Sequence, residues 1–469
     1  MLPDEILFSS ITDLAAQIRA RRISPVELTE SYLERLATVG RRLGAVASLM
    51  RDSALGEARS AEREIRRGRY RGLLHGIPYG AKDLLATRNA KTTWGATPYK
   101  DQQFETDATV IKKLHEAGAI LVAKLAMVEL AGGMGYNEAH ASWTGACKTP
   151  WNEEYWSGGS SSGPGAAVAA GLVAFSIGSE TSGSIITPAA FCGISGLRPT
   201  YGAVSRHGAM ALCWTLDKLG PMCRTARDCA IVLEAIKGRD PLDPTSVDGA
   251  ARTALSARLR GKGKAFRLAV MKDSYEKAQP EVRENFLRSI DVLKRFASVE
   301  MDVKLPDFPY GPAVGTIVDA EGASAFRDLI ESGRVQELAS PTGRLGGYSA
   351  SLVTAVDYLH AMRLRIPMRR AWDEMFSKHG ILVAPSRATV SYPLNKTFDQ
   401  AYPGISTTSP IGASNLVGVP AISILNGFGQ HNLPTGIQFI GPAWSEAALI
   451  DLAERYQQAT DWHKRRPQG

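Results

Sequence analysis

One segment constrains this chain more than any other. Between Trp151 and Thr200 the sequence is dense in glycine, serine, alanine and threonine. A flexible linker would share that composition, but this segment contains the apolar run AAVAAGLVAF, which is typical of a closely packed helix. Two loops rich in glycine and serine flank the run, GGSSSG before it and GSETSGS after it. Small residues let backbone approach backbone, as functional loops require, so we expect a folded site here.

Outside that segment, short apolar stretches alternate with helical patterns. The 469 residues, 44% of them hydrophobic and 22% charged, have a globular composition. Stretches divided by Gly and Pro, such as LLHGIPYGAKDLL and AILVAKLAMVEL, predict strands, and residues 108–117 between them predict a helix. We therefore expect an α/β fold in which a central mixed β-sheet is sandwiched between layers of α-helices, built as one domain over 1–469.

Four parts of this domain can be distinguished along the chain. Ser24 opens a capping box with proline at the first helical position, and a second, charged helix is expected over 54–67. Another helix begins at Pro280 after the strand RLAVM, and SEAALIDLAERYQQAT forms a final amphipathic helix. The parts are an N-terminal helical segment 1–70, a core 71–237, a linker or surface excursion 238–264, and a C-terminal part 265–469 with the rest of the sheet.

Charge and hydropathy exclude several classes of protein. The net charge is +8, and basic residues concentrate at 63–71 and 464–466. Because no aromatic residues interleave these runs, we interpret them as solvated helix ends rather than a nucleic-acid surface. No uncharged apolar run approaches the roughly 18 residues of a membrane span, and the N-terminus lacks the features of a signal peptide. We expect neither a nucleic-acid nor a membrane partner.

Cysteine and histidine spacing argues against metals. The five cysteines never form CxxC, which fits a reduced, cytoplasmic protein without a zinc ribbon. The eight histidines show no HxH or HxxxH pairing, and no phosphate-binding glycine motif is present. We therefore expect no metal and no organic cofactor.

Serine is the residue type that points to chemistry. One interpretation uses the GxSxG pattern at 159–163, the nucleophile elbow of α/β-hydrolases, with Ser161 as nucleophile; the elbow needs an apolar strand before it, and TPWNEEYWSG is not one. The second interpretation uses both loops. Because they flank one helix of small residues, they can bring the hydroxyl groups of Ser160 and Ser184 to one place. Lys82 lies in an apolar run that favours its neutral form, and a neutral lysine can activate a serine hydroxyl. Taken alone, Lys82 would more often be a surface lysine at a strand end.

The amino-acid sequence of these segments resembles that of the amidase signature family of serine hydrolases. The family pattern GGSSGG…GTDTGGSIRxPAxxxGxxGxKPTxG reads here as GGSSSG…GSETSGSIITPAAFCGISGLRPTYG. The resemblance continues in GIPYGAKDLL, LDKLGPMCRTARDCAIVLEAIKGRDPLD, NLVGVPAISIL, LPTGIQFIG and ATDWHKRRP, and so covers nearly the whole chain.

The resemblance implies a role for each catalytic residue. Lys82 would be the base, Ser160 the proton relay after a cis Gly159–Ser160 peptide bond, and Ser184 the nucleophile that forms the acyl-enzyme. Backbone N–H groups would form an oxyanion hole for the tetrahedral intermediate. Those groups belong to Thr181, Ser182, Gly183 and Ser184.

Departures from the family pattern bear on the substrate. Ser162 and Ser182 replace glycines, and Glu180 stands where aspartate is more frequent. Many members carry arginine two or three residues after the nucleophile, where this chain has Ile186 and Thr187. We therefore expect hydrolysis of neutral, fairly apolar carboxamides or anilides, and also of esters or carbamates, rather than of amides with a carboxylate beside the scissile bond.

Two alternatives remain open from the sequence. The same family includes the glutaminase (A-type) subunit of tRNA-dependent amidotransferases, which works within a complex. The other alternative is a catalytically inactive binding protein, although the three triad positions are intact. If neither alternative holds, we expect a small amide-type substrate as the partner and a monomer or homodimer as the oligomeric state.

Pocket walls are the least constrained part of the prediction. Loops that carry glycine and aromatic residues often line pockets, and three such stretches occur, at 131–143, 308–318 and 402–416. The candidate substrate-binding residues are Tyr136, Trp143, Ile186 and Trp214.

Overall fold

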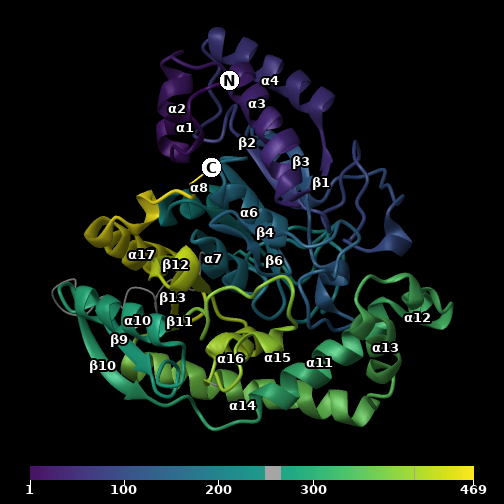
Figure 1. Ribbon diagram of the computed structural model, residues 1–469, viewed down its shortest axis with the longest axis vertical. Coiled ribbons are helices and arrows are strands. Elements are labelled where there is room, and N and C mark those ends of the chain that lie inside the picture. Colours follow the sequence, from purple (N-terminus) through teal and green to yellow (C-terminus); the bar gives the residue numbers. More distant parts are fainter. Residues whose placement is uncertain (249–265, 406, 469) are drawn as a thin grey trace.

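A large mixed sheet organises the chain, as expected. The computed structural model describes residues 1–248, 266–405 and 407–468, and its main sheet has 11 strands (Figure 1). Strand β2 is parallel to both β3 and β6, and β9 is parallel to β10 and β11, while the remaining pairs are antiparallel. In sheet order the strands are β1 (Val46–Leu49), β3 (Ile120–Leu125), β2 (Pro78–Lys82), β6 (Phe175–Glu180), β8 (Lys218–Cys223), β7 (Ser195–Arg198), β12 (Ala421–Phe428), β13 (Pro434–Ile440), β11 (Ile381–Pro385), β9 (Phe266–Met271) and β10 (Ala297–Val303).

Helices cover the sheet, and every residue of the central strands β2, β6, β8, β7, β13 and β11 is buried. Burial on both faces is what a sheet with parallel strands requires. Helices α6 and α7 pack on each other and on the central strands, and α8, α10 and α17 form a second packed group against strands of the same sheet. The helices are α1 (Asp4–Leu7), α2 (Ile11–Arg19), α3 (Pro25–Arg35), α4 (Arg51–Arg66), α5 (Thr109–Glu116), α6 (Ser162–Ala169), α7 (Ile186–Cys192), α8 (Ala226–Ile236), α10 (Pro280–Leu293), α11 (Tyr310–Ala325), α12 (Arg327–Glu331), α13 (Pro341–Ala350), α14 (Ala355–His379), α15 (Phe398–Ala401), α16 (Pro410–Val417) and α17 (Glu446–Thr460).

Local sequence signals place several of these elements. Ser24 caps α3 with the expected capping box, because its hydroxyl accepts from the Glu27 N–H and the Glu27 carboxylate accepts from the Ser24 N–H. Helix α10 begins at Pro280 and connects the parallel strands β9 and β10, as the strand–helix–strand pattern predicts. The run AAVAAGLVAF is not one continuous helix: its first four residues end α6, 170–174 form a turn, and Phe175 begins β6.

The prediction of a loop over 308–318 is wrong, because most of this segment belongs to helix α11. Gly311 and Gly315 lower the intrinsic helix propensity of this segment. The helix nevertheless packs on α13, α14 and α16, and burial of its apolar residues, such as Ala313 and Ile317, outweighs that preference.

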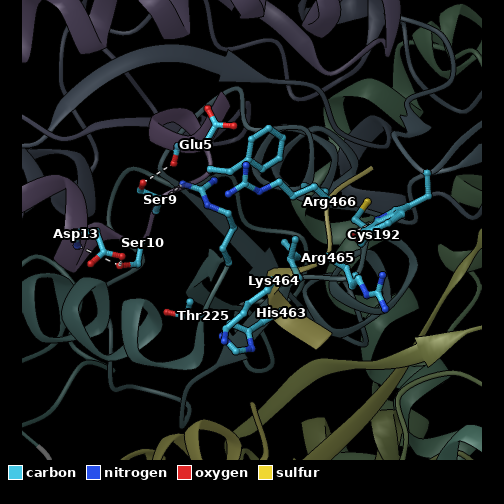
Figure 2. A pocket seen from close by; sticks show the side chains of 16 residues that line it. Glu5, Ser9, Ser10, Asp13, Cys192, Thr225, His463, Lys464, Arg465 and Arg466 are labelled. Carbon is cyan, nitrogen blue, oxygen red and sulfur yellow. Dashed lines mark hydrogen bonds between the residues drawn. The ribbon is translucent and has the colours of Figure 1, made fainter. Parts of the chain in front are cut away.

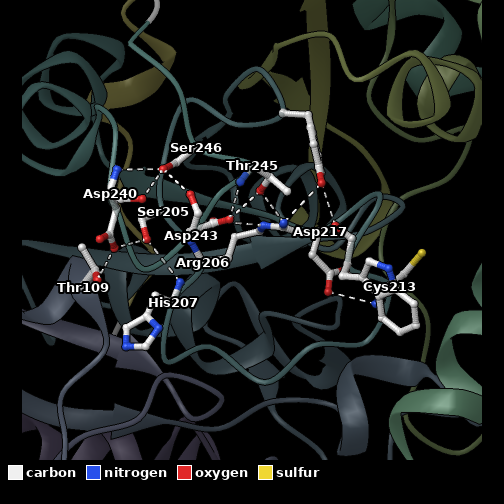
Figure 3. Close-up of polar contacts among 12 residues, drawn as sticks. Thr109, Ser205, Arg206, His207, Cys213, Asp217, Asp240, Asp243, Thr245 and Ser246 are labelled. Carbon is white, nitrogen blue, oxygen red and sulfur yellow. Dashed lines mark hydrogen bonds and ion pairs between the residues drawn. The ribbon is translucent and has the colours of Figure 1, made fainter.

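Residues 238–248, the described part of the expected linker or surface excursion, form a hydrogen-bonded turn (Figure 3). The Asp240 carboxylate accepts from the Ser205 and Thr109 hydroxyls, each at 2.6 Å. The Asp243 carboxylate accepts from the Arg206 N–H at 2.8 Å. Both carboxylates are nearly buried, and such donors are what makes their burial tolerable. The rest of the expected linker, 249–264, lies outside the described residues.

None of the helices in the described part of the chain is both long and apolar enough to cross a membrane.

The closest backbone approach in the central sheet gives a stability test. A Cβ on Gly220 in β8 would lie 2.1 Å from the Leu197 carbonyl oxygen in β7. We expect Gly220→Ala to push these strands apart and lower the free energy of unfolding by about 3 kcal/mol, measured by urea denaturation. Gly56→Ala in α4 is the matched control, because nothing lies within 4 Å of the added methyl group and helix propensity favours alanine. Equal midpoints for the two variants would contradict this account of the sheet.

Candidate active site

Lys82 is the last residue of β2 and is completely buried. Its Nζ atom donates to Ser160 Oγ at 2.7 Å and to Ser179 Oγ at 2.9 Å. Burial, opposed by the negative charges of Asp217 and Glu180, lowers the pKa of Lys82 to about 7. Near neutral pH a large fraction of this lysine is therefore an uncharged amine, which can accept a proton.

The two serine loops meet at the N-terminal end of α6. Ser160 follows a cis Gly159–Ser160 peptide bond, as the family resemblance implies. The Ser161 N–H donates to the Ser184 carbonyl oxygen at 3.3 Å, so the loop before α6 directly contacts the loop after β6. Ser160 and Ser184 are thus brought to one end of the sheet together with Lys82.

Ser161 lies in a different environment from Ser160 and Ser184. Its hydroxyl donates to the Ser179 carbonyl at 3.1 Å and accepts from the Ser179 N–H at 3.3 Å. It is fully buried, and the strand just before it, β5 (Asn152–Trp156), pairs with β4 (Lys148–Thr149) in a small sheet separate from the main one. The structure therefore lacks the strand–turn–helix context that a nucleophile elbow at Ser161 needs.

Glu180 shapes the loop that carries Ser184. Its Oε2 atom accepts the N–H groups of Ile185 and Ile186 at 2.8 and 3.0 Å, which fixes the start of α7. Its Oε1 atom accepts from Arg198 at 2.9 Å and Asn415 at 2.8 Å. Burial alone would raise the pKa of Glu180, but the Arg198 charge and these hydrogen bonds outweigh it and lower the pKa, so the carboxylate is ionised.

The loop between β6 and α7 presents free backbone donors. Gly183 has φ of +96°, a conformation that favours glycine, and its carbonyl accepts the Thr187 N–H at 2.8 Å. Within the described residues, the N–H groups of 181–184 donate to no protein acceptor. Adjacent unpaired N–H groups beside a serine can stabilise an oxyanion that forms there.

Thr181 connects this loop to β8. Its hydroxyl donates to Asp217 Oδ1 at 2.5 Å, and Asp217 Oδ2 accepts the N–H groups of Leu212 and Cys213, both at 2.9 Å. Burial raises the pKa of Asp217, while the hydrogen bonds from Thr181 and those two N–H groups oppose the rise. Asp217 thereby fixes Thr181 and places negative charge near Lys82.

The four expected pocket walls lie in different surroundings. Ile186 is fully buried in the main core as the first residue of α7. Tyr136 packs edge-on against Trp156 and Phe398. Trp143 is partly exposed and donates from Nε1 to Thr93 Oγ1 at 2.7 Å. Trp214 lines a cavity of about 200 Å³ together with Thr181 and Asp217.

Sequence reasoning missed the residues that hold these loops. Ser179, Arg198 and Asn415 are buried and bond to Lys82 or Glu180. Asp217 is half-buried and bonds to Thr181. A signal was present in the family pattern, because Glu180 and Arg198 both stand in its core, but pattern position alone does not show that the two side chains form an ion pair.

The most basic cavity is elsewhere. A cavity of about 360 Å³ lies between the two ends of the chain, where Arg224, Lys464, Arg465 and Arg466 line it together with Glu5 and Asp13 (Figure 2). The Arg466 guanidinium lies 5.1 Å from the centre of the Phe8 ring. None of the lining residues belongs to the serine loops, so this cavity is separate from the candidate active site.

No group of three or more His, Cys, Asp or Glu side chains is arranged to hold a metal ion in the part of the chain that the structure describes. The chemistry that these residues can provide is that of a buried amine, serine hydroxyls and backbone donors.

A lysine bonded to one serine, beside a second serine loop with free N–H groups, is suited to acyl transfer through serine. Comparison with known proteins agrees with this class. The family profile described as Amidase matches residues 27–450, and the chain belongs to this amidase signature family, whose enzymes are hydrolases acting on C–N bonds.

Three relatives illustrate the range within the family. The chain is 35% identical to the A-type subunit of the glutamyl-tRNA(Gln) amidotransferase of Moorella thermoacetica over 99% of both chains. It superposes on the native peptide amidase from Stenotrophomonas maltophilia with a TM-score of 0.83, 30% identity and 98% coverage of both chains. The corresponding values for the A-type amidotransferase subunit of Thermotoga maritima are 0.76 and 26%, with 98% of this chain and 96% of that chain covered.

The pKa of Lys82 makes a pH prediction that needs no known substrate. The rate at which a fluorophosphonate modifies the protein should rise with pH around 7 and level off above it, because only the neutral amine can accept a proton. Asp217→Asn removes a negative charge that raises the pKa of Lys82, so its profile should shift to lower pH. A purely structural role for Asp217 would lower the rate at every pH without moving the midpoint.

Proposed function

We propose that the protein is an amidase that hydrolyses neutral, fairly apolar carboxamides or anilides through an acyl-Ser184 intermediate, with esters and carbamates as further substrates. The observation that carries the proposal is the hydrogen bond of 2.7 Å between the buried Lys82 Nζ and Ser160 Oγ. It supports a proton path from Ser184 through Ser160 to a lysine whose burial favours the neutral amine.

The proposed cycle has two halves. Ser184 Oγ forms a bond to the amide carbonyl carbon while its proton passes through Ser160 to Lys82, and the oxyanion is held by the N–H groups of 181–184. When the tetrahedral intermediate collapses, the C–N bond breaks and the proton returns through Ser160 to the leaving nitrogen. Water then attacks the acyl-enzyme by the same route, which releases the acid and restores Ser184. The chain's own residues supply each of these steps.

The surroundings of Ser184 support a neutral group at the scissile bond. Helix α7, which follows it, has the sequence ITPAAFC and contains no charged residue. The nearby Glu180 charge is matched by Arg198, and both side chains are fully buried. No cationic side chain stands where many family members have arginine, so a carboxylate bonded directly beside the scissile amide would be desolvated there without a partner.

The second candidate is a glutaminase subunit that supplies ammonia to a partner. The 35% identity to the Moorella thermoacetica amidotransferase chain over 99% of both sequences favours it. The higher TM-score with the peptide amidase than with the Thermotoga maritima amidotransferase chain favours a self-sufficient amidase. Ammonia release from glutamine, compared with hydrolysis of neutral anilides by the same preparation, separates the two.

Labelling with a fluorophosphonate, followed by intact mass and peptide mapping, tests the proposal. We expect one adduct, on Ser184, and a rate about 10³-fold lower in Lys82→Ala, because the serine then lacks its base. Lys112→Ala, at an exposed position on α5, is the control and should label at the wild-type rate. An adduct on Ser161, or an unchanged rate in Lys82→Ala, would contradict the proposed mechanism.

A further inference from the structure

A third cavity lies at the carboxyl end of β11 and is unusual in its charge. It has a volume of about 300 Å³, and Arg387, Thr389, Tyr392, Thr408 and Pro410 are among its lining residues. Hydroxyl groups dominate the rest of the lining, and none of the described residues that line it is an aspartate or glutamate. The cavity thus combines one cation with many neutral donors.

This cavity borders the serine loops on one side through α16. Pro410 lines the cavity, and the next residue, Ile411, packs on the loop that carries the nucleophile. A Cβ on Gly183 would lie only 3.1 Å from Ile411 Cγ2. The wall at Pro410 is therefore one residue away from a side chain that contacts the loop with the free N–H groups.

A second connection runs through aromatic rings to the loop that carries Ser160. Tyr392 lines the cavity and stacks on Trp156 at 6.4 Å between ring centres. A Cβ on Gly159 would lie 2.7 Å from the Trp156 ring. Both serine loops are therefore in contact with residues that form or support the cavity wall.

Two polar groups in this cavity are buried without partners. Within the described residues, the Nε of Arg387 and the hydroxyl of Thr389 have no hydrogen-bond acceptor or donor, and Thr389 is only 7% exposed. Arg387 uses one terminal nitrogen to donate to the Tyr392 hydroxyl at 3.1 Å. In the same part of the chain, Arg387 forms no ion pair. Buried polar groups are normally hydrogen-bonded, so these two groups leave hydrogen-bonding capacity at the wall of the cavity.

We propose that Arg387 and Thr389 bind a carboxylate of the substrate, several bonds away from the scissile amide. A guanidinium can hold a carboxylate through two parallel N–H···O bonds, and the Thr389 hydroxyl can donate a third hydrogen bond. The substrate would then be neutral at the reacting carbonyl and anionic at its far end. This inference rests on the proposed amidase function and deepens it by naming the substrate class.

Matched pairs of chromogenic or fluorogenic amides test the subsite. On the acyl side, glutaryl 4-nitroanilide is compared with its neutral methyl ester; on the amine side, 4-(butyrylamino)benzoate is compared with butyranilide. We expect wild-type kcat/KM to favour the carboxylate member of at least one pair by about tenfold. In Arg387→Met that preference should fall to less than twofold, and Thr389→Val should reduce it in part. Arg370→Met, exposed on α14, is the matched arginine control and should keep the wild-type preference.

A binding measurement keeps the test independent of turnover. Titration calorimetry of the Ser184→Ala protein with the preferred carboxylate, or with glutarate and 4-(butyrylamino)benzoate if neither amide is hydrolysed, should give a Kd about tenfold weaker when Arg387→Met is added. No carboxylate preference in either pair, together with no binding difference, would overturn the subsite. If Ser184 is labelled and neutral anilides are hydrolysed, the amidase function stands when the subsite fails; if Ser184 is not labelled, the amidase function fails whatever the binding shows.

Discussion

The buried Glu180 carboxylate accepts hydrogen bonds from three separate parts of the chain. Arg198 belongs to β7, Asn415 to α16, and the Ile185 and Ile186 N–H groups to the start of α7. Because both charges of the Glu180–Arg198 pair are fully removed from water, loss of either partner would leave a buried ion that costs several kcal/mol. The Glu180 carboxylate therefore fixes the end of the Ser184 loop where α7 begins.

The same carboxylates that shape the loops also tune the lysine. Burial in the sheet disfavours the Lys82 ammonium, whereas Asp217 and Glu180 stabilise it, and the balance puts its pKa at about 7. Asp217 is itself held by Thr181 and by two backbone N–H groups, so its negative charge is fixed in position. The carboxylates that hold the serine loops in place therefore also set the pKa of Lys82, because charges interact strongly across a low-dielectric interior.

The two cavities beside the serine loops differ in their electrostatics. The cavity lined by Trp214 and Thr181 also holds the Asp217 and Asp243 carboxylates, which accept hydrogen bonds from Thr181 and from the Arg206 N–H. The cavity at the end of β11 contains an arginine Nε and a threonine hydroxyl that have no hydrogen-bond partner among the described residues. An amide lying across Ser184 could thus be neutral at the reacting carbonyl and still be recognised by charge elsewhere. The absence of arginine just after Ser184 and the presence of Arg387 in the cavity at the end of β11 are therefore compatible.

The sequence by itself determined much of the local structure and the identity of the candidate triad. Capping at Ser24, proline at the start of α10 and the alternation of strands with helices are short-range signals, and they predict the α/β class because each acts within a few residues. The family pattern likewise placed Lys82, Ser160 and Ser184. It did not predict helix α11, whose glycines are overridden by packing against α14, or the bonded turn at 238–248, whose aspartates find donors far along the chain. Only the tertiary structure decided that Glu180 meets Arg198 and Asn415, and that Arg387 faces a cavity beside the serine loops. Those contacts join residues distant in sequence, and burial, charge and hydrogen bonding between such residues exist only once the sheet has assembled.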